Sequence, residues 1–333
     1  MIQLPFDLLR LLADGGVHSA ADLGAALGVS RGAIWHQVRR IERLGLQVFK
    51  IRARGYRLAA PLDLLDAAAI AAALHSAQAN AVPAIRLQVV DQCASTSSLA
   101  LAHAREGAAP GLAIACENQT AGRGRYGASW HSGIGTSLTF SLLWRLPQGV
   151  AALSGLSLAV GVAMLRALKR HALEGVSLKW PNDLLAGGAK LGGILIELPG
   201  DAPGPSTIVV GVGLNVRLDA ALKAGIDQPA TALAEIAARA GAALPTRSAL
   251  LASALEELAL ALRRFGTSGF APFREEWQQH HAHQGRQVVL QLNQRRIAEG
   301  EALGVAPDGA LLLRSARGLE QFHSGQISLR ACA

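Results

Sequence analysis

The chain has 333 residues, half of them hydrophobic, and a formal net charge of +8. This length and composition predict a globular protein of two or three domains. The longest apolar runs, at residues 64–74 and 156–168, are broken by polar residues and fall short of the roughly 18 residues of a membrane span, which argues against a membrane protein.

The cysteines and the N-terminus indicate the compartment. Cys93, Cys116 and Cys332 are odd in number, widely spaced and without a C-x-x-C pair. Asp7 and Arg10 lie close to the start, and no small-residue cleavage site follows an apolar run, so we expect no signal peptide. A reducing cytoplasm is the simplest compartment.

Positive charge is concentrated at the N-terminal end. Residues 1–60 contain nine Lys and Arg against four acidic residues, an excess of five that makes up most of the net charge. Such a charge makes nucleic acid or a phosphorylated ligand a plausible partner.

Three helices are predicted in this basic segment. Apolar residues at helical spacing predict the first at residues 4–13. Ser19, followed three residues later by Asp22, has the spacing of a capping box for the second. Ser30 follows a three-residue turn led by glycine and caps a third helix over residues 31–44. Helix, short turn, helix is the helix-turn-helix pattern.

A wing is predicted after the third helix. Residues 47–51 and 56–59 have the composition of two short strands, joined by a basic turn. The alternative is a small helical domain with a solvated basic face. Under the DNA-binding interpretation, the residue types needed for base edges and phosphates are Ser30, Arg31, Trp35, His36, Gln37, Arg39, Arg40, Arg52 and Arg54.

One such module contacts few base pairs, so specificity usually requires a dimer on two half-sites. We therefore expect dimerisation through another part of the chain. Pro61 and the alanine-rich residues 63–80 indicate a linker followed by a helix.

The central part of the chain mixes strands with one long helix, predicted at residues 153–171. Most connections have the length of hairpins, so we expect an α+β domain with a largely antiparallel mixed sheet. The predicted strands are residues 86–90, 112–116, 136–144, 177–180, 193–198 and 206–216.

A glycine-rich basic loop interrupts this background. Gly122, Gly124 and Gly127 fit the G-x-G-x-x-G spacing of a dinucleotide-binding turn. The interpretation fails because residues 126–144 have no helical period and no suitable acid for a ribose. What remains is a loop suited to closing over an anion, or else a mobile surface loop that happens to be basic.

Three other polar segments accompany this loop: residues 95–97 after a strand, residues 179–183 at a strand end, and residues 190–193 opening the next strand. Each has a simple explanation as a helix cap, a turn or a hairpin. Together they favour phosphoryl chemistry, because loops and strand ends that carry Lys, Asp, Arg and Gly in one domain build such sites.

Four motifs resemble the biotin protein ligase family, in the same order and at similar spacing. They are Gly-Arg-Gly-Arg-x-Gly at residues 122–127, Lys-Trp-Pro-Asn-Asp at 179–183, Lys-Leu-x-Gly-Ile-Leu-x-Glu at 190–197 and Gly-x-Gly-x-Asn at 211–215. With the winged helix-turn-helix in front, the chain resembles, nearly end to end, the bifunctional form that is also a biotin operon repressor.

The resemblance implies two half-reactions. Biotin and ATP give biotinyl-5′-AMP and pyrophosphate, with Mg²⁺ as the accompanying ion and no permanently bound cofactor. A lysine of the biotin carboxyl carrier protein of acetyl-CoA carboxylase then takes the biotinyl group. It also implies a homodimer, formed when the protein is loaded with biotinyl-5′-AMP, that binds operator DNA.

The resemblance also implies a multi-domain fold. It comprises a winged helix-turn-helix at residues 1–62, a linker helix at 63–84, a class II synthetase-like α+β catalytic domain with a mixed sheet at 85–282, and an SH3-like β-barrel at 283–333. Alternating apolar and polar residues from 285 onward, with a turn at residues 307–309, agree with the last of these.

The family's site residues carry over by motif. The implied catalytic residues are Arg125, Lys190 and Asp183, with Asp183 also an indirect Mg²⁺ ligand. The implied biotin-binding residues are Ser95, Thr96, Ser97, Gln119, Arg123, Gly124, Arg125 and Lys190. The implied nucleotide-binding residues are Arg123, Arg125, Trp130, Asn182, Asn215 and Arg330. The chain departs from the family's usual pattern at Ser97, commonly Asn, and at Gln326, usually acidic, which bears on Arg330.

Two other functions stay open. One is a DNA-binding biotin sensor without significant ligase activity, against which the complete set of charged motif residues argues. The other is a ligase for a related acid such as lipoate, whose enzymes have different motifs. His280, His281 and His283 do not predict a metal site, because a polar helix end explains them and no matching ligands follow.

Overall fold

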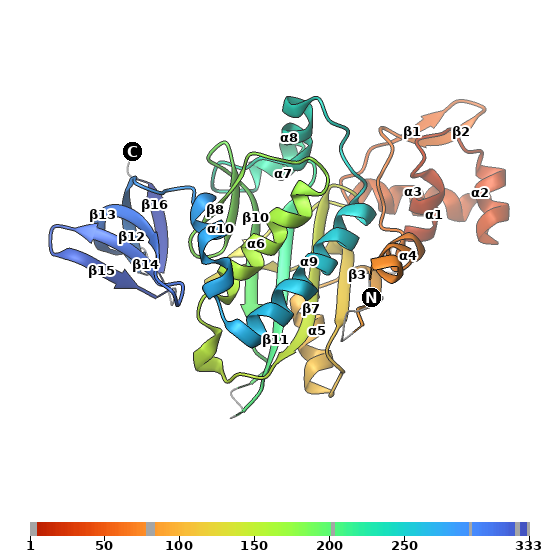
Figure 1. Ribbon diagram of the computed structural model, residues 1–333. Coiled ribbons are helices and arrows are strands. Elements are labelled where there is room, and N and C mark those ends of the chain that lie inside the picture. Colours follow the sequence, from red (N-terminus) through yellow and green to blue (C-terminus); the bar gives the residue numbers. More distant parts are fainter. Residues whose placement is uncertain (1–4, 78–83, 201–203, 293–294, 324–326, 332–333) are drawn as a thin grey trace.

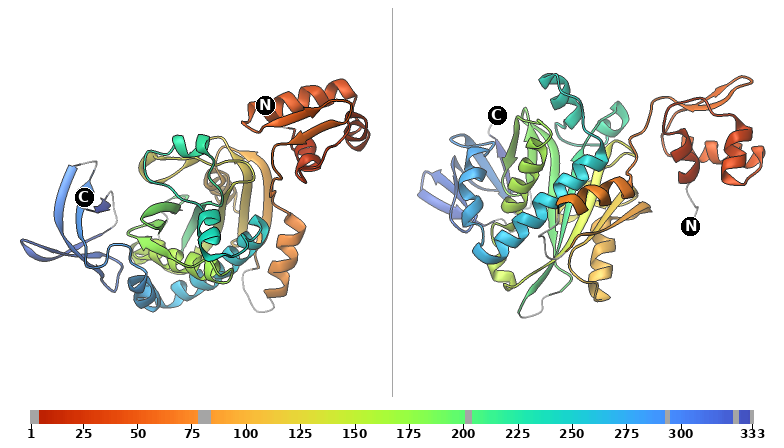
Figure 2. Two further views of the ribbon diagram at one scale, coloured as in Figure 1. Left: turned by 90° about the horizontal axis from the view of Figure 1, so that it is seen from above. Right: turned by 45° about the vertical axis from the view of Figure 1, so that its right-hand side comes forward.

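The computed structural model describes residues 5–77, 84–200, 204–292, 295–323 and 327–331. Figure 1 shows three parts in a row: a small N-terminal part, a central sheet covered by helices, and a C-terminal sheet. The two further views in Figure 2 show the same order. Cys332 and Gln326, both named above, lie outside the described residues.

The N-terminal part is a winged helix-turn-helix, as predicted. Ser19 accepts a hydrogen bond from the Asp22 N–H and Ser30 accepts one from the Ala33 N–H, so both predicted N-caps are confirmed. Two antiparallel strands form the wing. The elements are α1 (Phe6–Leu12), α2 (Ala20–Leu27), α3 (Arg31–Arg43), β1 (Val48–Ile51) and β2 (Gly55–Leu58).

The central sheet has seven strands in the order β3-β4-β7-β11-β10-β9-β8. Among the described pairs only β3 and β4 run parallel, which confirms the largely antiparallel mixed sheet. The strands are β3 (Arg86–Cys93), β4 (Leu112–Gln119), β7 (Ser137–Leu146), β8 (Val176–Lys179), β9 (Asp183–Ala186), β10 (Ala189–Glu197) and β11 (Ser206–Asn215).

Helices cover both faces of this sheet. On one face α6 (Leu156–Lys169) packs along α9 (Arg247–Ser268), and α4 (Ala67–Ala77) packs on α9; on the other lies α5 (Thr96–Arg105). The α9 helix is not among the helices predicted from the sequence, and α5 was indicated there only by the helix-cap interpretation of residues 95–97. The α9 helix is buried along most of its length and so lacks the alternation of polar and apolar faces that marks a surface helix.

Shorter elements complete the central part. A small hairpin, β5 (Gly122–Arg123) and β6 (Ser129–Trp130), encloses the 3₁₀ turn η1 (Arg125–Gly127). The others are η2 (Val150–Leu153), α7 (Ala220–Ala224), α8 (Leu233–Ala240), η3 (Ala271–Phe273) and α10 (Arg274–Gln279).

The C-terminal part is a five-stranded antiparallel sheet in the order β15-β14-β13-β12-β16. The predicted turn is present, with the Gly309 N–H donating to Ala306 O. Closure into an SH3-like barrel stays a prediction. The strands are β12 (Gln287–Leu292), β13 (Arg295–Val305), β14 (Leu311–Ser315), β15 (Gly318–Phe322) and β16 (Ile327–Ala331).

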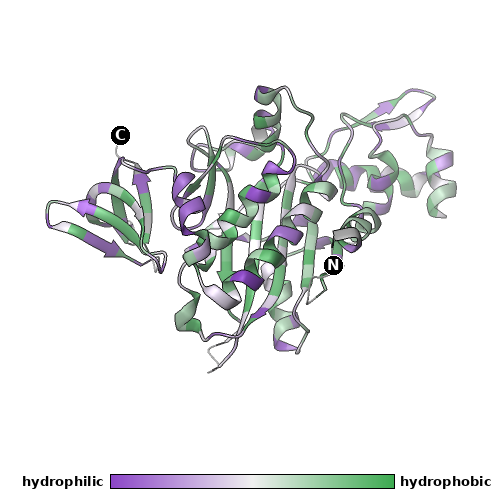
Figure 3. Ribbon diagram, viewed as in Figure 1, coloured by the Kyte–Doolittle hydropathy of each residue, from purple (hydrophilic) through white to green (hydrophobic). Residues whose placement is uncertain are grey.

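One contiguous hydrophobic core extends from α4 through the central sheet to the C-terminal strands, and a separate core fills the winged helix. Figure 3 shows the apolar residues along the central strands and the inner faces of α6 and α9. No helix within the described ranges is long and apolar enough to cross a membrane.

Two histidines are buried where the central and C-terminal parts meet. The segment after α10 pairs with β8, because the Leu178 N–H donates to His280 O and the Ala282 N–H donates to Leu178 O. His281 and His283 are each 7% exposed, so the polar helix end expected here is wrong for these two. Within the described part of the chain no group of metal-ligating side chains forms a metal site.

Burial lowers the pKa of His281 and of His283 from 6.5 to about 4. Because the folded pKa is the lower one, no stability is lost above pH 6.5, and stability falls as the pH drops from 6.5 toward 4. At pH 5 the lowered pKa of each histidine should reduce the free energy of unfolding by at most about 2 kcal/mol. Urea unfolding at pH 7.5 and pH 5 should show that the His281→Gln/His283→Gln double variant loses less stability between these two pH values than the wild-type protein does. An equal loss in both proteins would contradict the prediction.

Candidate active site and DNA interface

A cavity of about 220 Å³ opens where the four polar segments meet. Asp183 pairs with Gly193 on β10, which brings the β8–β9 hairpin level with the segment at residues 190–193. Eleven of the predicted site residues line it: Ser95, Thr96, Ser97, Gln119, Arg123, Gly124, Arg125, Trp130, Asn182, Asp183 and Lys190.

A cluster of hydrogen-bonded hydroxyl groups lies at the cavity. Ser95 is the N-cap of α5, as its helix-cap interpretation implies. The Thr96 N–H donates to Gln119 Oε1 at 2.7 Å, and Thr96 Oγ1 lies 2.8 Å from Ser141 Oγ. Ser97 Oγ lies 3.0 Å from the same Ser141 Oγ. Ser141 was not among the predicted site residues. The sequence feature that could have identified it is a serine inside the otherwise apolar strand β7.

A cluster of charged groups also lines the cavity. Lys190 Nζ lies 2.8 Å from Asp183 Oδ1, and Lys179 Nζ lies 3.6 Å from Asp183 Oδ2. The β8–β9 hairpin pairs Lys179 with Asp183, which fixes this arrangement. Burial lowers the pKa of Lys179, with the neighbouring Asp183 opposing the effect. Lys179 also lines the cavity, although it was absent from the predicted residues.

The two arginines of the basic loop have different partners. Arg125 donates to Asn182 Oδ1 at 3.2 Å and to the Tyr126 hydroxyl, and its guanidinium lies 4.7 Å from the Tyr126 ring centre. Arg123 instead donates to both carboxylate oxygens of Glu197, at 2.8 and 2.9 Å. The loop therefore forms a hairpin in which Arg125 contacts the Lys-Trp-Pro-Asn-Asp segment and Arg123 contacts the end of β10.

Two glycines of β11 allow close packing under the cavity. A Cβ on Gly211 would lie 2.5 Å from Ser97 Oγ, and a Cβ on Gly213 would lie 2.4 Å from the Trp130 indole. Residues two apart point to the same face of a strand, so the Gly-x-Gly spacing clears one face for Ser97 and Trp130. The Trp130 Nε1 is buried with no hydrogen-bond partner in the described chain.

Two predicted nucleotide-binding residues do not line the cavity. Asn215 is buried and donates from Nδ2 to Lys190 O and Thr231 O, which anchors the backbone of Lys190. Arg330, on β16, donates from Nε to Gln291 Oε1. Its neighbours Ile327 and Leu329 do line the cavity, a contribution of the C-terminal part that the sequence did not predict.

The predicted DNA-binding residues lie on the outer face of α3 and at the wing tip. Ile34, Val38 and Ile41 face the core, so the opposite side of α3 is exposed. Trp35 is 43% exposed, with the Arg39 guanidinium 5.5 Å from its ring centre. The exposed predicted residues are Ser30, Arg31, Trp35, His36, Arg39, Arg40, Arg52 and Arg54, and Gln37 is half-buried.

Three family models match consecutive parts of the chain: an HTH domain at residues 6–57, the Biotin/lipoate A/B protein ligase family at 90–215, and a Biotin protein ligase C terminal domain at 283–330. Among solved structures, a biotin protein ligase from Aquifex aeolicus in complex with biotin and ATP is 28% identical. Its TM-score is 0.64, and the match covers 74% of this chain and 99% of that one.

The fold is thus that of a biotin protein ligase preceded by a helix-turn-helix module. Proteins called bifunctional ligase/repressor BirA are 37% identical in Salmonella typhimurium and 36% identical in Escherichia coli, and in both cases 98% of each chain is covered. The chain therefore belongs to the BirA family of bifunctional biotin ligases and repressors.

Proposed function

We propose that this protein activates biotin with ATP to biotinyl-5′-AMP and transfers the biotinyl group to a lysine of a biotin carboxyl carrier protein of acetyl-CoA carboxylase. We propose further that the protein loaded with biotinyl-5′-AMP forms a homodimer that binds operator DNA and represses transcription. The observation that supports the proposal is one cavity that is lined both by hydroxyl-bearing side chains and by Arg125, Lys179 and Lys190.

The hydroxyl-bearing part of the lining suits biotin. An apolar bicycle with a ureido group needs an apolar slot and a few fixed polar contacts. Thr96 and Ser97 provide hydroxyls held by Ser141, and Phe140 and Val212 provide apolar wall. In this arrangement the valeryl carboxylate points toward Arg125 and Lys190.

The first step brings a carboxylate up to a polyanion, so cations must be in place beforehand. Arg125 and Lys190 neutralise charge that builds on the α-phosphate as the carboxylate oxygen attacks and pyrophosphate leaves. Arg123 contributes to anion binding only after its guanidinium leaves Glu197. The cations are preorganised by Asn182 and Asp183, which lowers the reorganisation that the reaction requires.

Mg²⁺ belongs to the proposal as the ion that accompanies ATP. Asp183 is the only carboxylate among the described residues that line the cavity, and two lysines already share it. These residues do not form a metal cage, and Mg²⁺ commonly keeps its waters and binds phosphates with one or two carboxylates. A contact from Asp183 would be indirect, and no step here depends on it.

Asp183 has a second role in the transfer step, where the incoming carrier lysine must be neutral to attack the mixed anhydride. We propose that the Asp183 carboxylate orients this lysine. In the Asp183→Asn variant, transfer from preformed biotinyl-5′-AMP should slow about 10-fold or more, since a charge-assisted hydrogen bond contributes about 1.5 to 3 kcal/mol. Single-turnover transfer at the wild-type rate would reject the role.

We propose that the Trp130 indole lies against adenine. We propose also that Asn215 hydrogen-bonds the edge of the adenine base after nucleotide binding breaks the present contacts of Asn215. A Gly213→Ala substitution should displace the Trp130 indole, because the new Cβ would lie 2.4 Å from it. Misplacement by about 1 Å can cost up to about 100-fold in rate, so we expect the KM for ATP to rise at least 10-fold. The KM for biotin should change little, and equal changes in both would contradict the assignment.

The repressor function rests on the exposed basic face of α3 and the wing. Trp35, Gln37 and Arg40 suit base edges, and Arg52 and Arg54 at the wing tip suit phosphates. Ligand-dependent dimerisation supplies a second winged helix, which binds the other half-site of the operator.

Sedimentation with and without biotin and ATP tests this half of the proposal. The loaded protein should sediment as a dimer and bind promoter DNA of biotin biosynthesis genes. A protein that forms biotinyl-5′-AMP and stays monomeric would contradict the repressor coupling. Preferential adenylation of lipoate in a competition assay would instead favour the related-acid ligase.

A further inference from the structure

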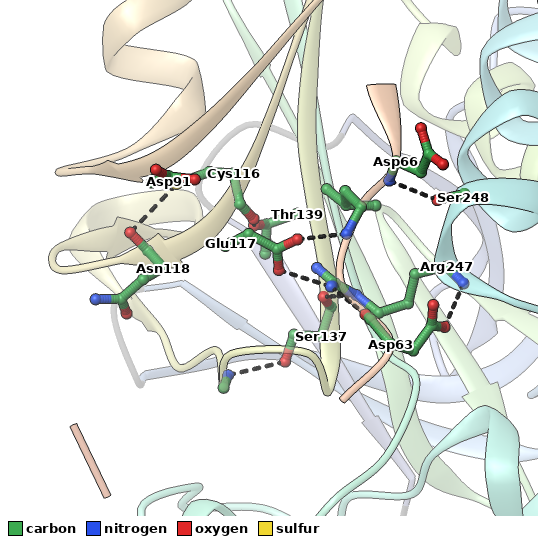
Figure 4. Close-up of polar contacts among 12 residues, drawn as sticks. Asp63, Asp66, Asp91, Cys116, Glu117, Asn118, Ser137, Thr139, Arg247 and Ser248 are labelled. Carbon is green, nitrogen blue, oxygen red and sulfur yellow. Dashed lines mark hydrogen bonds and ion pairs between the residues drawn. The ribbon is translucent and has the colours of Figure 1, made fainter. Parts of the chain in front are cut away.

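A buried ion pair lies beside the segment that connects the winged helix to the central sheet (Figure 4). Arg247, the first residue of α9, places Nη1 2.7 Å from Glu117 Oε2 on β4. Their side chains are 0% and 2% exposed. Taking two charges out of water is costly, so a pair buried this deeply needs further hydrogen bonds.

Those hydrogen bonds go largely to the connecting residues 62–66, called the linker here. Arg247 donates from Nη1 to Asp63 O at 2.7 Å and from its backbone N–H to Asp63 Oδ2 at 2.6 Å. The Leu65 N–H donates to Glu117 Oε1 at 2.5 Å, and the Asp66 N–H donates to Ser248 Oγ at 2.9 Å. Both members of the ion pair therefore hold the linker backbone.

The same pair holds two strands that lead to the cavity. Glu117 lies two residues before Gln119, which accepts the Thr96 N–H at the cavity wall. Arg247 Nε donates to Ser137 O at 2.8 Å, at the start of β7. The cavity-lining part of β7 follows two residues later. A shift at either strand end would therefore also displace the ion pair.

A second contact joins the cavity and the linker independently. The segment that follows Trp130 carries Ile134, which is buried in the core of the winged helix. It also carries Gly135, where a Cβ would lie 3.1 Å from Leu62 Cδ2. The segment that presents Trp130 to the cavity thus also packs on the linker.

We propose that Arg247 and Glu117 are positioning residues that transmit the occupancy of the cavity to the linker and so to the winged helix within one chain. A ligand that fixes Gln119 and Trp130 holds the linker in one place, and by reciprocity a fixed winged helix favours the occupied cavity. The inference rests on the proposed function, because it takes biotinyl-5′-AMP as the ligand. Dimer formation is not required for it.

Amide hydrogen exchange of the full-length protein, with and without biotin, ATP and Mg²⁺, tests this proposal. In peptides that cover residues 62–66, bound biotinyl-5′-AMP should slow exchange about 10-fold at the Leu65 and Asp66 amides. In Asp63→Ala, which keeps the ion pair and loses the acceptor of the Arg247 N–H, the ligand-dependent slowing should fall below about twofold.

Thr246→Ala is the matched control. Thr246 caps the same end of α9 through the Ala249 N–H, and removing that cap leaves the bonds from Arg247 to the linker in place. This variant should keep the full ligand-dependent slowing. Ser248→Ala, which removes the acceptor of the Asp66 N–H, gives a second test if Asp63→Ala fails to fold.

Two results would overturn the inference. One is equal exchange of the wild-type linker in the empty and loaded states. The other is an Asp63→Ala or Ser248→Ala protein that exchanges faster in both states and keeps the ligand-dependent slowing, as a merely structural anchor would. Mass spectrometry of the same samples reports whether biotinyl-5′-AMP has formed. Its absence would contradict the proposed function itself.

Discussion

Replacing Lys190 by glutamine should lower kcat/KM for adenylation of biotin about 100-fold. Lys190 Nζ lies 2.8 Å from Asp183 Oδ1 at the cavity wall, and we propose that it stabilises the charge that develops on the phosphate. A charge-assisted hydrogen bond contributes about 1.5 to 3 kcal/mol, and about 1.4 kcal/mol corresponds to a factor of ten in rate. Most of the loss should fall on kcat, because the developing charge is greatest in the transition state. Pyrophosphate release measures it.

The matched control is Arg145→Gln, which removes an exposed cation from β7 outside the cavity. Its rate should stay within about twofold of wild type, because exposed charges away from the site contribute little. A Lys190→Gln protein that folds normally and adenylates biotin at the wild-type rate would remove Lys190 from the mechanism.

Arg247→Met should lower the free energy of unfolding by about 3 to 5 kcal/mol. The substitution leaves the Glu117 carboxylate 2% exposed and without its cation, and an uncompensated buried charge carries a cost of that size. It also removes the guanidinium bonds to Asp63 O and Ser137 O. Urea unfolding at pH 7.5 measures the loss.

The double variant Arg247→Met/Glu117→Gln separates the charge from the packing. With no carboxylate left to bury, it should recover part of the loss, and the non-additivity reports the coupling between the two residues. A loss below about 1 kcal/mol in Arg247→Met would be the value of an exposed ion pair and would contradict the structural assignment.

Features encoded by neighbouring residues were predictable from the sequence. Ser19 and Ser30 cap their helices because an N-cap contacts N–H groups only two or three residues away. The wing is equally local, whereas β9 was not among the predicted strands. All four motifs contribute residues to the lining of one cavity.

Contacts between distant residues were not predictable in this way. Glu117 and Arg247 are 130 positions apart, and Arg123 and Glu197 are 74 apart. No local pattern pairs them, because a buried charge is matched by whichever element the fold brings beside it. The part that β16 plays at the cavity wall likewise depends on how the C-terminal sheet docks.

The central claim is that one cavity makes and transfers an activated biotin. The most direct measurement is mass spectrometry after incubating the protein with biotin, ATP and Mg²⁺, and then with a biotin carboxyl carrier protein. We predict biotinyl-5′-AMP bound to the protein, followed by a biotinyl group on one carrier lysine. A protein that binds biotin yet forms no biotinyl-5′-AMP and leaves the carrier unmodified would contradict the claim and identify a biotin sensor instead.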